Sequence, residues 1–126
     1  MNIGISGAAT VGQVLARHLA AAGHNVMIAN SRGPESLRDL VEQLGSRVTA
    51  GHVPEALDNP AVILGVPWTR VQDVLTPEID WGGRVLIDAT NIFTSYAPHF
   101  EIDDLGGDSG SEIVSRQAPS ARVVKA

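Results

Sequence analysis

The sequence predicts an α/β protein whose core is a doubly wound, parallel β-sheet of about six strands. Three observations support this fold class. Apolar runs alternate with helical patterns along the chain, the run 61–65 is apolar on both faces, and the first strand–helix–strand unit fits within residues 2–30. Strands that are apolar on both faces are typical of parallel sheets covered by helices on both sides, and right-handed crossovers are then expected.

The first unit begins with the β-rich run 2–6 and continues into a helix that Gly23 ends. The run 25–30 is the expected second strand. Apolar residues at helical spacing predict the buried face of the helix: Val11, Val14, Leu15, Leu19 and Ala22.

The second unit begins at Gly33–Pro34, where proline and Glu35 suit the first turn of a helix. Gly45 ends this helix, and the run 47–50 is a weak third strand. A short helix near 53–58 leads to the strand 61–65. The expected buried residues of the longer helix are Leu37, Leu40, Val41 and Leu44.

In the last third of the chain, two capping boxes predict helix starts, one at Thr69–Gln72 and one at Ser109–Glu112. A fifth strand is expected at 84–90 and a sixth at 121–125. The segment 91–108, rich in glycine, aspartate and aromatic residues, is expected to be a long loop.

Length and composition exclude several function classes. The 126 residues match one compact domain spanning 1–126. The absence of cysteine excludes disulfides, thiolate nucleophiles and cysteine-ligated zinc, and the four histidines show no metal-ligand spacing, so no metal site is expected. A net charge of −5 without a basic cluster argues against nucleic acid. No apolar run is long enough for a membrane span and no signal peptide is evident, so a cytoplasmic location is expected.

The segment "GAATVG" (7–12) nearly spells the dinucleotide-binding fingerprint G-x-G-x-x-G of Rossmann folds, between the first strand and the first helix. Gly7 permits the tight turn and Gly12 lets the helix pack against the strand. The backbone amides of Ala9, Thr10 and Val11 would then face a pyrophosphate at the helix N-terminus. Ala9 replaces the middle glycine, and its methyl either holds the ligand off or points aside where φ is negative. The alternative is a strand–helix turn that binds no ligand.

The end of the second strand indicates which dinucleotide would bind. NAD-selective sites place a carboxylate there, whereas this chain has Asn30, Ser31 and Arg32. A hydroxyl and a guanidinium suit a 2′-phosphate. A charge-assisted hydrogen bond of roughly 1.5–3 kcal/mol predicts a preference of about ten- to hundredfold for NADP(H). Arg38 is a second candidate, and the alternative for Arg32 is a solvated loop arginine.

Five segments together resemble the N-terminal domain of NADP-dependent oxidoreductases of the deazaflavin (coenzyme F-420) type. They are "IGISGAATVG", "VMIANSRGPESL", "VILGVPW", "VLIDATN" and "ARVVKA". Membrane ferric reductases carry a similar cytoplasmic domain. The family pattern continues after "VVKA" into a helical region that helps build the acceptor site and the dimer. The chain is therefore expected to be the NADP(H)-binding domain without that region.

The resemblance implies a cofactor site in which the glycine-rich turn holds the diphosphate and the end of the second strand holds the 2′-phosphate. The ends of the fourth and fifth strands would line the ribose and the nicotinamide. Trp68 is open to a second interpretation as a core residue, and Asn91 as an Asx-turn residue. The implied residues are Gly7, Ala9, Thr10, Val11, Gly12, Ser31, Arg32, Val66, Pro67, Trp68, Ala89, Thr90 and Asn91.

The function that the resemblance implies is hydride transfer between NADP(H) and a deazaflavin- or flavin-like acceptor or another small molecule. This reaction needs distance and orientation rather than a protein acid or base, so no catalytic side chain is predicted. Asp88, at a strand end, is interpreted as a structural carboxylate. A non-catalytic NADP(H)-binding or redox-sensing module and an apo scaffold are the alternatives. Self-association into a homodimer is a further expectation.

Overall fold

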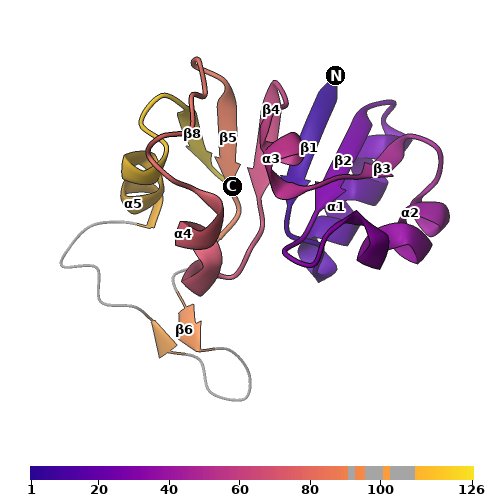
Figure 1. Cartoon of the computed structure of the whole chain (residues 1–126), viewed down its shortest axis with the longest axis horizontal. Coiled ribbons are helices and arrows are strands. Elements are labelled where there is room, and N and C mark those ends of the chain that lie inside the picture. Colours follow the sequence, from indigo (N-terminus) through magenta and orange to yellow (C-terminus); the bar gives the residue numbers. More distant parts are fainter. Residues whose placement is uncertain (91–92, 96–100, 103–109) are drawn as a thin grey trace.

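The computed structural model describes residues 1–90, 93–95, 101–102 and 110–126. Its centre is a six-stranded sheet with the order β3-β2-β1-β4-β5-β8, in which every neighbouring pair is parallel (Figure 1). This order is that of a doubly wound Rossmann-type sheet, as predicted. The strands are β1 (Asn2–Ser6), β2 (Asn25–Ala29), β3 (Val48–Ala50), β4 (Ala61–Leu64), β5 (Val85–Asp88) and β8 (Arg122–Lys125).

Helices cover both faces of this sheet (Figure 1). The α-helices are α1 (Thr10–Ala21), α2 (Arg38–Leu44), α3 (Val53–Leu57), α4 (Val71–Val74) and α5 (Gly110–Gln117). Two 3₁₀ turns, η1 (Pro34–Leu37) and η2 (Trp68–Arg70), precede α2 and α4. Pro34 therefore opens a helical segment as predicted, but the first turn is 3₁₀ and the α-helix follows it.

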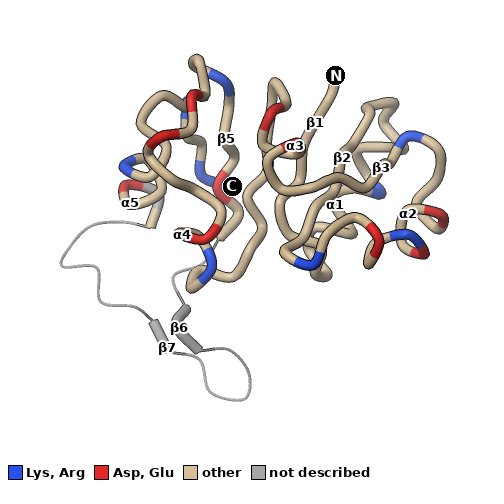
Figure 2. The backbone as a smooth tube through the Cα atoms, in the orientation of Figure 1, with Lys and Arg blue, Asp and Glu red and all other residues tan. Residues whose placement is uncertain are grey.

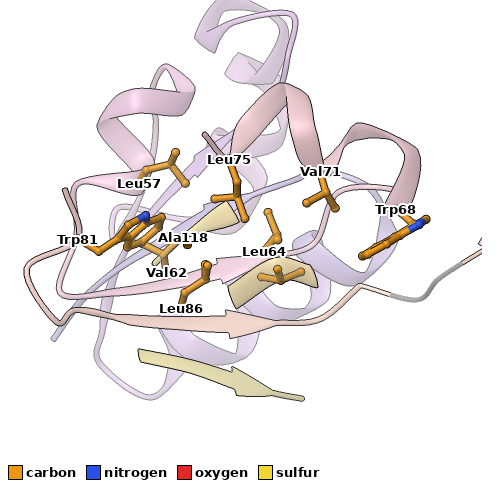
Figure 3. Packing of buried hydrophobic residues seen from close by; sticks show 10 residues of the cluster. Leu57, Val62, Leu64, Trp68, Val71, Leu75, Trp81, Leu86 and Ala118 are labelled. Atoms are coloured by element: carbon orange, nitrogen blue, oxygen red, sulfur yellow. The ribbon is translucent and has the colours of Figure 1, made fainter. Parts of the chain in front are cut away.

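Side chains that alternate along β4 divide the core into two clusters, one on each face of the sheet. Val62 and Leu64 pack with residues of α3, α4 and α5, whereas Ala61 and Ile63 pack with residues of α1 and η1. Figure 3 shows the first cluster, with Leu75 and Trp81 above the strands. All four residues of β4 are buried, as the doubly apolar run predicted.

The buried face of α1 agrees with the sequence prediction only in part: Leu15 and Leu19 are half-buried and pack against the core, whereas the other predicted residues are exposed. Val11 and Val14 are 57% and 40% exposed, whereas Gly12 and Ala16 are buried. The reason is steric: a Cβ atom at Gly12 would lie 2.0 Å from the carbonyl oxygen of Gly7. At this closest approach between α1 and the β1 turn only glycine fits, so residue size overrides hydrophobicity at the N-terminal end of the buried face.

Two further predictions need correction. Neither η2 nor α4 has a side-chain cap, so the capping box predicted at Thr69–Gln72 is wrong; Thr69 lies inside the 3₁₀ turn, which follows the extended Pro67. The segment predicted as a loop contains two short antiparallel strands, β6 (Phe93–Ser95) and β7 (Glu101–Ile102). Ser109 of the second predicted capping box lies outside the described residues.

The carboxyl ends of the strands are aligned in register across the sheet. Ser6 pairs with Ala29 on one side and with Leu64 on the other, and Leu64 pairs with Asp88. Backbone hydrogen bonds extend each pairing by one residue: the N–H of Gly65, for example, donates to the carbonyl of Ser6 at 2.8 Å. The loops that follow β1, β2, β4 and β5 therefore leave the sheet along one edge.

None of the helices in the described segments has both the length and the apolar character needed to cross a membrane.

Replacing Gly4 with alanine is expected to destabilise the fold. A Cβ atom at Gly4 would lie 1.8 Å from the carbonyl oxygen of Ala56 in α3, so the helix would have to move away from β1. Forced overpacking of this kind costs about 1–3 kcal/mol or more of unfolding free energy. Urea unfolding followed by circular dichroism measures the loss.

Gly65→Ala is the matched control. A Cβ atom there would meet its nearest atom, the Ser6 oxygen, at 3.7 Å, which is ordinary van der Waals contact. Equal stability losses for the two variants would contradict the close packing of α3 on β1.

Candidate functional site

Two adjoining hollows lie along the carboxyl edge of the sheet and share residues of the β1–α1 and β4–η2 loops. The first has a volume of about 390 Å³ and extends from the end of β2 to α4. The second has a volume of about 330 Å³ and extends from the start of α1 to the end of β5. The residues that line both are Ala9, Gly65, Val66 and Pro67. Together the hollows form one elongated cleft across the ends of four strands, β2, β1, β4 and β5.

The β1–α1 turn has the geometry that the glycine pattern predicts. Gly7 has φ +120°, and a Cβ atom there would lie 2.6 Å from the carbonyl oxygen of Gly65. Ala9 has φ −76° and ψ −173°, an extended conformation that any residue adopts. The substitution of alanine for the middle glycine therefore causes no backbone strain.

The N-terminus of α1 is open toward the cleft. The first intrahelical bond runs from the N–H of Gln13 to the carbonyl of Ala9 at 3.0 Å, so the amides of Thr10, Val11 and Gly12 have no intrahelical acceptor. No side chain caps this end, and its first turn contains no acidic residue. Since the helix dipole adds partial positive charge, this site suits an anion such as a diphosphate.

The end of β2 is held by Asn30. Its side-chain oxygen accepts the backbone N–H groups of Arg32 at 3.1 Å and Gly33 at 3.0 Å, and its amide donates to Ser36 at 3.0 Å. Asn30 and Ser31 line the first hollow. The carboxamide thus occupies the place of the carboxylate of NAD-selective sites, and its oxygen is fully used in holding the loop.

The two arginines of this region differ in their surroundings. Arg32 is exposed on the loop, is not among the residues that line the hollow, and pairs with no carboxylate of the described residues. Arg38 is paired with Glu35 at 3.0 Å, so its charge is already compensated.

At the end of β4, Val66 and Pro67 line both hollows, but Trp68 does not. Trp68 is 8% exposed and belongs to the core cluster with Leu64 and Val71 (Figure 3). The structure thus favours the core interpretation of Trp68. It anchors the η2 turn and thereby fixes the cleft wall from behind.

At the end of β5, Ala89 and Thr90 line the second hollow. Asp88 is fully buried and its Oδ1 accepts the N–H of Thr90 at 2.9 Å and the hydroxyl of Thr90 at 2.5 Å. Lys125 Nζ donates to the carbonyl of Thr90 and lies 4.0 Å from Asp88 Oδ1. Asp88 is therefore a structural carboxylate, as predicted, which orients Thr90. Asn91 lies outside the described residues.

Several residues of the first hollow carried no recognisable signal in the sequence. They come from α3, η2 and α4, which reach the edge only after the chain has folded: Val53, Arg70, Asp73 and Val74. The role of Asn30 in holding the loop "SRG" could have been predicted, because asparagine at the start of a turn commonly accepts the backbone N–H two residues on.

A third hollow of about 440 Å³ lies between α3 and α4. Its described lining includes three carboxylates, of Asp58, Asp73 and Asp80, whereas that of the first hollow includes only Asp73. Arg84 also lines the third hollow, but its guanidinium already donates to the backbone carbonyls of Leu57 and Asn59. Charge therefore favours the cleft at the strand ends as the anion site.

Comparison with known proteins identifies the family. The model of the family described as NADP oxidoreductase, coenzyme F420-dependent, matches residues 2–92. The chain belongs to this family. The resemblance noted from the sequence motifs is confirmed. No curated protein matches it significantly.

Solved structures with the same fold extend this result. A hypothetical protein from Sinorhizobium meliloti is 41% identical with a TM-score of 0.88, and the match covers 99% of this chain and 60% of that one. A proposed F420-dependent NADP reductase from Arthrobacter sp. FB24 is 23% identical with a TM-score of 0.79, over 99% and 61% of the two chains. The chain thus spans about three fifths of the length of both relatives.

A 3-hydroxyisobutyrate dehydrogenase from Mycobacterium tuberculosis is 19% identical with a TM-score of 0.66, over 98% of this chain and 39% of that one. At this identity the likeness concerns the fold alone.

Ala9→Asp is expected to stabilise the chain and to weaken NADPH binding. Ala9 is the N-cap of α1 in extended conformation, where aspartate gains about 1 kcal/mol over alanine. The same carboxylate would repel a diphosphate, with a loss of roughly tenfold or more in affinity. Thermal unfolding and NADPH fluorescence titration measure the two effects.

Ala9→Asn is the matched control because asparagine caps as well as aspartate but carries no charge. We expect equal stabilisation and a smaller loss of affinity. If Ala9→Asp binds NADPH as tightly as the unaltered chain, the anion does not sit at the α1 N-terminus.

Proposed function

We propose that this domain binds NADP(H) across the carboxyl edge of its sheet and presents the nicotinamide for hydride transfer with a deazaflavin- or flavin-like acceptor. The observation that carries the proposal is the continuous cleft with the uncapped N-terminus of α1 at its middle. A dinucleotide has the corresponding arrangement, with a flat adenine ring on one side of a diphosphate and a flat nicotinamide ring on the other. Ligands of open α/β sheets bind at this edge, where the strand order reverses.

The two hollows suit the two halves of the cofactor. The first borders the end of β2, where a Rossmann fold places the adenine ribose, so it would take the adenosine. The amides of Thr10 and Val11 would bind the diphosphate. The second hollow, beside Ala89 and Thr90, would then take the nicotinamide.

The end of β2 would select NADP(H) over NAD(H). Ser31 offers a hydroxyl, and Arg32 offers a guanidinium that pairs with no carboxylate among the described residues. Asn30 stands where a carboxylate would repel a 2′-phosphate. By holding the N–H of Arg32, Asn30 also fixes where that side chain leaves the loop. Affinity for the 2′-phosphate would thus depend on both residues.

The chemistry of the proposed reaction resides in the cofactor. When bound, NADPH supplies a hydride from C4 of its nicotinamide ring. Among the described residues that line the second hollow none has a titratable side chain, so these residues would contribute position and exclusion of water. Thr90, held by Asp88, would orient the ring.

A non-catalytic NADP(H)-binding module is the second candidate function. It is favoured by the same apolar lining, since binding alone also needs no acid or base. Acceptor-dependent oxidation separates the two: the reductase consumes NADPH when a deazaflavin or flavin is added, and the binding module does not. Absorbance at the NADPH maximum records the difference.

Arg32→Ala is expected to weaken NADPH about ten- to hundredfold and to leave NADH nearly unchanged. The physical reason is the loss of a charge-assisted hydrogen bond of roughly 1.5–3 kcal/mol that only the 2′-phosphate accepts. Fluorescence titration with each dinucleotide measures the ratio of affinities.

Arg38→Ala removes an arginine that is already paired with Glu35 and serves as the control, with little change expected for either ligand. Equal losses of NADPH and NADH affinity in the Arg32 variant would refute the assignment of the 2′-phosphate. Absence of NADPH binding to the unaltered chain would refute the proposed function itself.

A further inference from the structure

We propose that Arg70 clamps the adenine ring of the bound dinucleotide by stacking its guanidinium on the ring. This inference rests on the proposed NADP(H) function and adds to it a residue that no motif of the sequence indicates. It also separates two tasks at the adenosine end of the cleft: recognition of the ring and recognition of the 2′-phosphate.

The fold brings Arg70 to the adenosine end of the cleft. It ends the η2 turn, and its backbone N–H donates to the carbonyl of Pro67 at 2.8 Å. The buried ring of Trp68 fixes this turn to the core. Because β2 and β4 flank β1, η2 borders the first hollow opposite the loop that carries Ser31. In Figure 2, basic and acidic stretches lie side by side at α4, beside the edge where the strands end.

Most of the neighbouring lining suits a flat, apolar ring. Val53, Val66 and Val74 contribute aliphatic surface from three different elements, and Pro67 adds its own ring. An adenine held between such groups needs a partner for its remaining exposed face. The planar, weakly hydrated guanidinium of arginine stacks on aromatic rings, and Arg70 lines the same hollow.

The charge around Arg70 favours the neutral ring over a phosphate. Its Nη1 lies 3.3 Å from Oδ2 of Asp73, and Asp73 also lines the hollow. The pair carries no net charge, and the carboxylate would repel a 2′-phosphate dianion. Arg32, which pairs with no carboxylate among the described residues, is the better phosphate ligand.

Titration of Arg70→Ala with NADPH and with NADH tests the inference, with Arg38→Ala as the control for removing an exposed, paired arginine. Since both dinucleotides contain adenine, the variant should weaken both by the same factor, about three- to thirtyfold. Arg70→Lys keeps the charge but loses the plane, so it should recover little of the affinity.

Three results would overturn the inference while the unaltered chain binds NADPH. One is unchanged affinity in Arg70→Ala, and another is a loss confined to NADPH, which would assign Arg70 to the 2′-phosphate. The third is full recovery in Arg70→Lys, which would indicate a point charge acting on the phosphates. If the unaltered chain binds neither dinucleotide, the proposed function fails first and the inference falls with it.

Discussion

The contact between Gly12 and the carbonyl of Gly7 sets the distance between α1 and the sheet. A Cβ atom at Gly12 would lie 2.0 Å from that oxygen, so a larger residue would lift the N-terminal turn of the helix away from β1. The uncapped amides of Thr10 and Val11 face the cleft only because the helix begins this close to the strand. The anion site, and with it the position of both hollows, depends on this approach.

Close backbone approaches of the same kind continue across the sheet, where the strand ends are aligned. A Cβ atom at Gly7 would lie 2.6 Å from the carbonyl oxygen of Gly65, and the N–H of Gly65 donates to the carbonyl of Ser6. The β1 and β4 loops are thereby fixed to each other, and they form the part of the cleft that the two hollows share. Asp88 extends this order to β5 by holding Thr90 at the far end. Backbone contacts and hydrogen bonds along this edge of the sheet thus position a site that has few charged side chains.

The sequence predicted what depends on local pattern and failed where packing or distant contacts decide. The alternation of strands and helices was enough to predict the doubly wound sheet. Gly7 and Gly12 were enough to predict the turn at its edge. Periodicity could not reveal that α1 buries Gly12 and Ala16 in place of Val11, because it registers hydrophobicity and the limit there is size. The place of Arg70 in the cleft could not be predicted from the sequence for a different reason. Its neighbours in the cleft lie in loops far away in the sequence.

The central claim is that NADP(H) binds over the N-terminus of α1, and backbone amide NMR during an NADPH titration tests it most directly. The account predicts the largest shifts at the amides of Thr10, Val11 and Gly12, because these donors gain phosphate acceptors. Shifts confined to the hollow between α3 and α4, around Leu57 and Ile79, with the α1 amides unmoved, would contradict it.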